Sequence, residues 1–119
     1  MFMIKKEVVE SIIMAARNVY PDEFFSMLGG TSKLIEELVI VPATYGKNFS
    51  SFRSDLIPFD KKIIGTIHSH PSVYNHPSKA DLDAFRKFGN IHIIISHPYD
   101  LNTIRAFDNK GNQEQLKVI

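Results

Sequence analysis

The sequence contains no cysteine among its 119 residues. This absence excludes disulfide bonds, thiol nucleophiles and cysteine-ligated zinc sites, and it is consistent with a reducing compartment. Long apolar runs are also lacking: Ile93-Ile94-Ile95 falls far short of the about 20 residues that a membrane-spanning helix needs. The first residues, Met1–Glu7, become charged too early for a signal peptide. We therefore expect a cytoplasmic protein with no membrane segment.

An excess of charge of one sign is missing too. Fourteen Lys and Arg residues against thirteen Asp and Glu give a formal net charge of +1. Proteins that bind nucleic acid usually carry a strongly basic face or arm, so the composition does not favour a nucleic-acid partner. The length and the 44% of apolar residues fit one domain with its own core. We expect a single domain over residues 1–119.

The spacing of apolar residues separates expected helices from expected strands. Apolar residues recur at helical spacing over about residues 5–19, and again at Leu82, Phe85 and Phe88 within residues 79–88. Short apolar runs predict strands at about residues 24–28 (closed by two glycines), 34–41, 63–67, 91–96, 103–107 and 115–118. This mixture indicates an α/β domain in which helices cover the faces of a central sheet.

Residues 68–81 carry the strongest chemical signal. The pattern is His68-x-His70, seven residues, Ser78, two residues, and Asp81. Because side chains alternate along a strand, both imidazoles project from the same face if the preceding strand continues to them. Two imidazoles and a carboxylate can form a three-ligand metal site with a fourth position for water, as in catalytic zinc sites. The same ligand set alone also suits non-haem iron.

Each half of this pattern also has an ordinary structural interpretation. A His-x-His pair by itself is common. Ser78 and Asp81, three residues apart at the expected start of a helix, are typical of a capping box, in which both side chains bond backbone amides. Local spacing favours this capping role, and it is compatible with metal binding because both residues lie at the helix N-terminus. The conjunction of all four residues favours a metal site.

The conjunction resembles the JAMM (MPN+) metalloprotease family, whose pattern is an upstream glutamate, then His-[Ser/Thr]-His-Pro, then Ser-x-x-Asp. The segment Pro21–Leu28 is similar to the family's Pro-x-Glu-x-x-Gly-x-Leu element, with Ser26 where glycine is usual. The order of expected helices and strands agrees over nearly the whole chain, and the length is similar to that of single-domain archaeal and bacterial members. The resemblance implies the JAB1/MPN fold, a cytidine-deaminase-like mixed sheet between helices in αβα layers.

The resemblance also implies roles for individual residues. His68, His70 and Asp81 would bind one Zn²⁺ per chain. Glu23 would be the general base that activates the water at the zinc, and Ser78 would help to stabilise the oxyanion. The sequence alone does not select Glu23 from the other acidic residues, which include Glu7, Glu10, Asp22, Glu36 and Glu37.

The activity that the resemblance implies is that of a zinc-dependent isopeptidase. Such an enzyme hydrolyses the bond between the C-terminal glycine of a ubiquitin-like modifier and a lysine amine, so conjugates of ubiquitin-like or sulfur-carrier proteins are the expected partners. One alternative is a non-catalytic MPN scaffold for protein–protein interaction, which the complete set of motif residues disfavours. Another is C-terminal trimming of a sulfur-carrier protein.

The sequence does not identify the substrate-binding residues or the oligomeric state. The segment 42–60 lacks clear periodicity, and Phe49 and Phe52 within it are candidates for pairing with an extended substrate tail. The simpler interpretation, which we favour, places both phenylalanines in the core.

Overall fold

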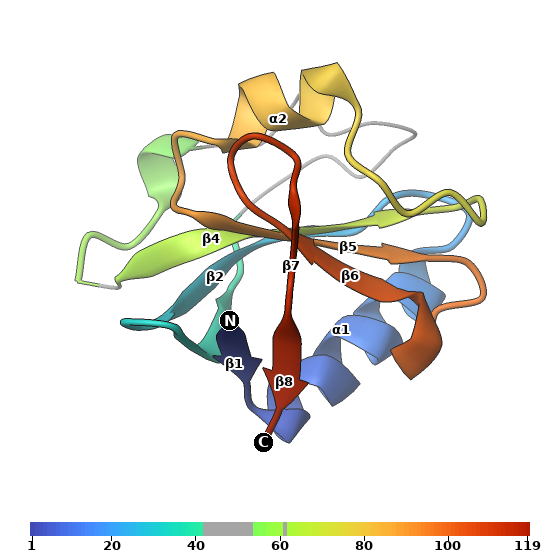
Figure 1. Cartoon of the computed structure of the whole chain (residues 1–119), viewed down its shortest axis with the longest axis horizontal. Helices are drawn as coiled ribbons and strands as arrows, with labels where there is room; N and C mark the ends of the chain where they lie inside the picture. The colour runs from blue at the N-terminus through green and yellow to red at the C-terminus, as the bar shows by residue number, and fades with distance from the viewer. Residues whose placement is uncertain (42–53, 61) are drawn as a thin grey trace.

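The computed structural model describes residues 1–41, 54–60 and 62–119. In this part of the chain, eight strands form one mixed sheet between two α-helices. Helix α1 (Lys6–Val19) lies on one face of the sheet and helix α2 (Lys79–Phe85) on the other (Figure 1). The predicted α/β class with αβα layers is therefore confirmed. Neither of these helices is long and apolar enough to cross a membrane.

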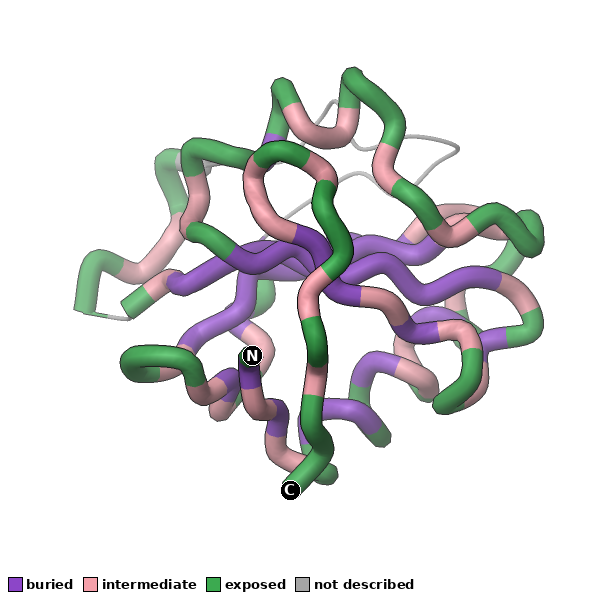
Figure 2. Tube along the Cα trace, viewed as in Figure 1, coloured by how far each residue is buried: buried purple, intermediate pink, exposed green. Residues whose placement is uncertain are grey.

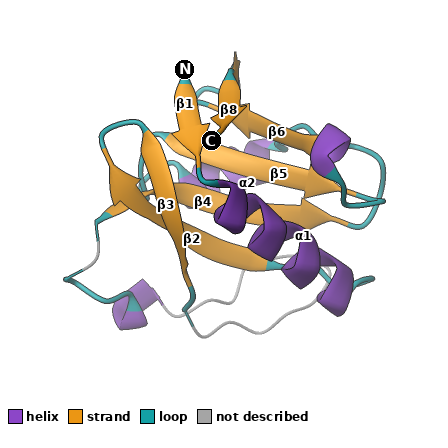
Figure 3. Cartoon of the chain, turned by 90° about the horizontal axis from the view of Figure 1, so that it is seen from below, coloured by secondary structure: helices purple, strands orange, loops and turns teal. Residues whose placement is uncertain are grey.

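The sheet has the strand order β7-β6-β5-β4-β2-β3-β1-β8. Its strands are β1 (Phe2–Ile4), β2 (Phe25–Thr31), β3 (Leu34–Val39), β4 (Ile63–His70), β5 (Ile91–Ser96), β6 (Ile104–Phe107), β7 (Gln113–Glu114) and β8 (Leu116–Val118). Short 3-10 turns cover Ser54–Leu56 and Leu101–Thr103. Strands β4 and β5 are parallel, and β2 is antiparallel to β3 and β4. Strands β7 and β8 form the two opposite edges of the sheet: β7 pairs with β6, and β8 pairs with β1. The C-terminus therefore lies beside the N-terminus (Figures 1 and 3).

The larger core lies between α1 and the sheet. Helix α1 lies along one face of the sheet and alternates between buried and exposed residues (Figures 2 and 3). Its buried side packs against branched aliphatic side chains of the central strands. The buried residues of this layer include Val8, Val9, Ile12, Ala16, Ile67, Ile91, Ile93 and Ile95. Because strand side chains alternate between faces, the neighbouring positions on β4 and β5 face α2 instead. The α1 layer thus forces His68 and His70 to the opposite face.

A second, smaller core lies under α2. Phe25, Met27, Val39, Val41 and Phe85 are buried together there. The Phe25 and Phe85 rings stack with centroids 4.9 Å apart, which fixes α2 over β2 and β4. Because Phe25 lies opposite His68, this contact holds the last turn of α2 beside the end of β4.

Several predicted boundaries differ from the structure. Strand β2 continues through Gly29 and Gly30 to Thr31, because a tight hairpin requires glycine: a Cβ on Gly30 would collide with the Leu34 carbonyl. Strand β3 ends at Val39, before residue 41. Helix α2 ends at Phe85 rather than Phe88, since the Phe88 amide bonds the Phe85 carbonyl in a tighter turn.

The shortest strands and the undescribed segment bear on two further points. Strands β1 and β7 were not predicted, because three and two residues are too few to show a period of two. Phe49 and Phe52 lie outside the described residues, so their expected core or substrate contacts stay predictions.

Gly65 of β4 provides a test of the packing beneath the histidines. A Cβ added there would collide with the backbone carbonyl of Ile91, whereas a Cβ on Gly29 would meet only side-chain atoms, Val39 Cγ2 at 2.9 Å and Glu37 Cγ at 3.0 Å. Gly65→Ala should lower the free energy of unfolding by about 3 kcal/mol, and Gly29→Ala by clearly less, because side chains yield more easily than a strand. Urea unfolding measures both. Equal losses would contradict the close approach of β4 and β5.

Candidate metal centre

Both histidines lie at the end of β4 and face α2. The strand runs through His70, longer than the predicted residues 63–67, so the two imidazoles share one face as expected. His68 is 1% exposed and its ring lies 5.4 Å from that of Phe85. Pro71 follows at once, where the strand ends. The histidine pair is thus held on a rigid strand at its junction with a loop.

Asp81 comes to the same place from the first turn of α2. Ser78 is the N-cap: its Oγ accepts a hydrogen bond from the Asp81 amide (3.0 Å), and Asp81 Oδ2 accepts one from the Ser78 amide (2.9 Å). The predicted capping box is therefore present. It also fixes the carboxylate in the orientation in which it meets the histidines, so capping and convergence are compatible.

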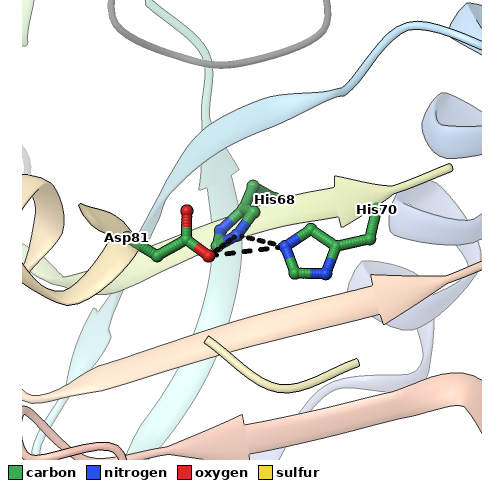
Figure 4. A group of neighbouring side chains, drawn as sticks. All are labelled: His68, His70 and Asp81. Carbon is green, nitrogen blue, oxygen red and sulfur yellow. Dashed lines mark hydrogen bonds and ion pairs between the residues drawn. The ribbon is translucent and has the colours of Figure 1, made fainter. Parts of the chain in front are cut away.

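Three donor atoms converge at this point (Figure 4). The Nε2 atoms of His68 and His70 are 3.1 Å apart, and they lie 3.3 and 3.4 Å from Asp81 Oδ2. Among the described residues, these three form the group that could hold a metal ion. Ligand atoms about 2.0–2.1 Å from a tetrahedral zinc ion are separated by about 3.3 Å. The spacing of the donor atoms therefore fits zinc.

The orientation of His70 is fixed from outside this group. Its Nδ1–H donates to the Tyr74 carbonyl at 2.8 Å, and the His70 imidazole is stacked on the Tyr74 side-chain ring with the two ring centroids 6.2 Å apart. A carbonyl can only accept, so in the neutral imidazole the lone pair is on Nε2, which faces the convergence point. Such an outer hydrogen bond is typical of metal-binding histidines.

The electrostatics of the three residues suit a cation. Burial raises the pKa of Asp81, but hydrogen bonds to His68 and His70 outweigh it, and the net pKa is well below its usual value. Burial lowers the pKa of His68 and keeps that ring neutral. Burial also opposes protonation of His70, but the bonds to Asp81 and Tyr74 prevail and raise its pKa. A metal ion would compete with that proton.

Glu23 lies beside these residues because of strand pairing. The antiparallel register sets Phe25 opposite His68, and one backbone bond joins Ser69 to Phe24. Continued by one residue beyond the Phe24–Ser69 pair, this register brings Glu23 opposite His70. The Glu23 side chain then lies on the same face of the sheet as the His70 imidazole. Burial raises the pKa of Glu23 to about 7; His70 lowers it and Asp81 raises it, so both lie within electrostatic reach. The carboxylate that the resemblance selected is therefore beside the candidate ligands.

The other histidines lie outside the group of candidate ligands. His92 accepts a hydrogen bond from Thr66 at Nδ1 (2.8 Å) and donates from Nε2 to Asn109 (2.6 Å), which makes it a satisfied residue of the sheet. His97 belongs to a turn and packs on an aromatic ring. His76 is exposed on the loop after β4.

Two contributions were not foreseen from the sequence. Tyr74 acts through its main-chain carbonyl, which every residue type carries, so no side-chain signal existed. Ser69 accepts a hydrogen bond from the Phe24 amide at 2.7 Å, and the hydroxyl residue between the two histidines was an available signal. Ser26, the departure from the family pattern, is buried and donates to the Met27 and Val39 carbonyls, so its hydroxyl is accommodated.

Comparison with known proteins agrees with this geometry. A family model described as prokaryotic homologs of the JAB domain matches residues 5–110. The chain belongs to the JAB1/MPN (JAMM) family. A probable metalloprotease from Haloferax volcanii is 32% identical over 127 residues, which cover 98% of this chain and 78% of that protein.

Two solved structures share the JAB1/MPN fold with this chain. A JAB1/MPN domain protein from Archaeoglobus fulgidus is 35% identical with a TM-score of 0.82, and the match covers 99% of each chain. A structure described as JAMM, a metalloprotease-like zinc site in the proteasome and signalosome, is 33% identical with a TM-score of 0.80 over 100% of this chain and 98% of the other. The predicted family and fold are therefore confirmed, and three residues of the JAMM motif, His68, His70 and Asp81, make up the candidate metal centre.

The raised pKa of Glu23 has a consequence for stability. Its folded-state pKa of about 7 exceeds the ordinary 4.5. The folded protein therefore keeps a proton that the unfolded chain has released, and stability is lost as pH rises from about 4.5 through 7. In the metal-free protein, Glu23→Gln should raise the free energy of unfolding at pH 8 by about 1 kcal/mol, a value reduced because the carboxyl is only half-buried.

At pH 4 the same substitution should change little, and the exposed Glu10→Gln on α1 serves as the control at both pH values. Urea unfolding at the two pH values measures the difference. A pH-independent effect of Glu23→Gln would contradict the burial of its carboxyl.

Proposed function

We propose that this chain is a zinc-dependent isopeptidase of the cytoplasm, which hydrolyses the bond between the C-terminal glycine of a ubiquitin-like modifier and a lysine amine. The observation that carries the proposal is the convergence of two imidazole nitrogens and one carboxylate oxygen at 3.1–3.4 Å, with Glu23 on the same face. The relative described as a probable metalloprotease supports the hydrolytic assignment.

His68, His70 and Asp81 would hold the metal. Bound zinc would supply Lewis acidity, which polarises a carbonyl group and lowers the pKa of water to about 7. The strand holds the two rings, and the Tyr74 carbonyl keeps His70 Nε2 pointed inward. These supports maintain the ligand geometry without help from a substrate.

Glu23 would transfer the proton. A general base is most effective when its pKa lies near the working pH, and the pKa of this carboxyl is raised to about 7. It would accept a proton from the water that attacks the glycine carbonyl carbon. It would then give that proton to the lysine nitrogen as the carbon–nitrogen bond breaks, so that water is divided between the acid and amine products.

Ser78 would stabilise the oxyanion. Its Oγ serves the capping box as an acceptor, which leaves the hydroxyl hydrogen for donation. A donor directed at developing negative charge contributes strongly to acyl-transfer catalysis. The Ser78 oxygen would therefore cap the helix, while the hydrogen of the same hydroxyl group would bind the oxyanion.

Metal content and turnover together test the proposal. Purified protein should bind about one zinc per chain, and zinc-loaded protein should cleave isopeptide-linked conjugates of ubiquitin-like or sulfur-carrier proteins. His68→Ala and Asp81→Ala should lose both properties. Glu23→Gln should keep the zinc and lower kcat by about 10³-fold, since only the proton carrier is removed. His76→Ala, on the loop between β4 and α2 but outside the ligand group, is the control. Elemental analysis and mass spectrometry of the products measure these outcomes.

Other outcomes would favour a different function. If zinc-loaded protein cleaves no conjugate and Glu23→Gln behaves identically, the isopeptidase assignment is wrong. Products shortened at the C-terminus of a sulfur-carrier protein, with isopeptide bonds intact, would indicate trimming instead. A protein that binds no zinc and is indifferent to His68→Ala would be a scaffold.

Substitutions of Ser78 separate capping from catalysis. Replacing an N-cap serine by alanine costs about 1 kcal/mol, whereas glycine costs only a few tenths. Ser78→Ala and Ser78→Gly should therefore differ in stability, but both should lower kcat by about 10²-fold, because both lack the hydroxyl. Thermal unfolding and steady-state kinetics measure the two effects. If Ser78→Gly retains wild-type kcat, the serine serves the helix alone.

A further inference from the structure

Ser69 lies between the two histidines and points to the opposite face of β4. It is fully buried, and its Oγ accepts a hydrogen bond of 2.7 Å from the Phe24 amide. The Ser69 amide in turn donates to the Phe24 carbonyl at 2.9 Å. In a hydrogen-bonded pair of antiparallel strands, the two opposite residues exchange two backbone N–H···O=C hydrogen bonds. Here the serine hydroxyl takes the place of one backbone carbonyl, just before β2 begins.

The amide that Ser69 binds belongs to the peptide group that joins Glu23 to Phe24. Holding this peptide group fixes the backbone on the C-terminal side of Glu23, and with it the direction of the Glu23 side chain. Phe24 is itself buried, so its amide has little access to water as a substitute acceptor. Strand β4 therefore supports both histidine ligands and the segment that carries the Glu23 carboxylate.

We propose that Ser69 is a positioning residue, whose hydroxyl holds the Glu23–Phe24 peptide against β4 and so keeps the Glu23 carboxyl aligned with the metal centre. Ser69 faces away from the centre and does not contact the reacting atoms. Its effect on catalysis rests on the proposed isopeptidase function, but its effect on the Glu23 segment does not.

Ser26 supplies a matched control. It is equally buried on the adjacent strand β2, but its hydroxyl donates to the carbonyls of Met27 and Val39. Removing the Ser26 hydroxyl takes a donor away from these carbonyls, but it takes no acceptor away from a backbone amide. A carbonyl tolerates the loss of a partner better than an amide does. Removing the Ser69 hydroxyl leaves the buried Phe24 amide without its acceptor. Ser69→Ala and Ser26→Ala thus remove the same group from comparable sites, with different consequences for Glu23.

The first measurement uses zinc-loaded protein and isopeptide-linked conjugates. Ser69→Ala should keep about one zinc per chain, since the ligands are untouched, and should lower kcat at least tenfold with KM within about twofold. Ser69→Thr retains the hydroxyl and should restore kcat to within about threefold of wild type, and Ser26→Ala should match wild type. A Ser69→Ala variant with wild-type kcat overturns the proposal, and so does a loss of kcat equal to that of Ser26→Ala.

The second measurement needs no substrate and no metal. Hydrogen exchange of the Phe24 amide, followed by NMR, should be at least tenfold faster in Ser69→Ala and close to wild type in Ser69→Thr and Ser26→Ala. The backbone order parameter of Glu23 should fall in Ser69→Ala alone. If both quantities are unchanged in Ser69→Ala, the positioning role is wrong whatever the activity.

The two measurements separate the two proposals. If wild-type protein cleaves no conjugate while the Phe24 amide and Glu23 respond as expected, the isopeptidase function fails and the positioning role stands. If wild-type protein is active and Ser69→Ala is equally active, the function stands and the positioning role fails.

Discussion

The antiparallel pairing of β2 with β4 is the constraint on which the metal centre depends. It sets Phe25 opposite His68 and brings Glu23 opposite His70, although the bonded residues Phe24 and Ser69 are 45 positions apart in the chain. A slip of one residue would turn every side chain of one strand to the other face and separate the carboxylate from the histidines. The packing of Phe25 against Phe85 uses the same register to hold α2 in place. One pairing therefore aligns all the elements of the centre.

The surroundings shift the pKa values of Asp81 and of the neighbouring Glu23 in opposite directions. Hydrogen bonds to the histidines hold the pKa of Asp81 well below its usual value, whereas burial raises the pKa of Glu23 to about 7. Groups whose environments separate their pKa values in this way are suited to different tasks. An ionised Asp81 suits a cation, and a Glu23 that titrates near neutral pH suits proton transfer. The capping box assists the first task, because the amide of Ser78 bonds the same oxygen that faces the histidines.

The parts of the structure that local pattern determines were predicted well. Helix α1 follows from helical periodicity and strand β5 from its short apolar run, and the alternation of side chains along β4 explains the shared face of the histidines. The capping box followed from spacing alone. Glu23 was selected only through the family resemblance, because its position depends on a register between distant segments, which no local pattern encodes. The hydroxyl of Ser69 between the histidines was an available signal, but its partner, the Phe24 amide, depends on the same register. Strand β2 was predicted too short because its glycines mark a tight hairpin rather than its end.

The central claim is that His68, His70 and Asp81 together bind one zinc ion with these side-chain atoms. X-ray absorption spectroscopy at the zinc edge of the loaded protein tests it most directly. The account predicts a four-coordinate ion with scattering from two imidazole rings and with nitrogen and oxygen ligands at about 2.0–2.1 Å. In His68→Ala the zinc signal itself should be lost. A spectrum without imidazole scattering, or one unchanged in His68→Ala, would contradict the account.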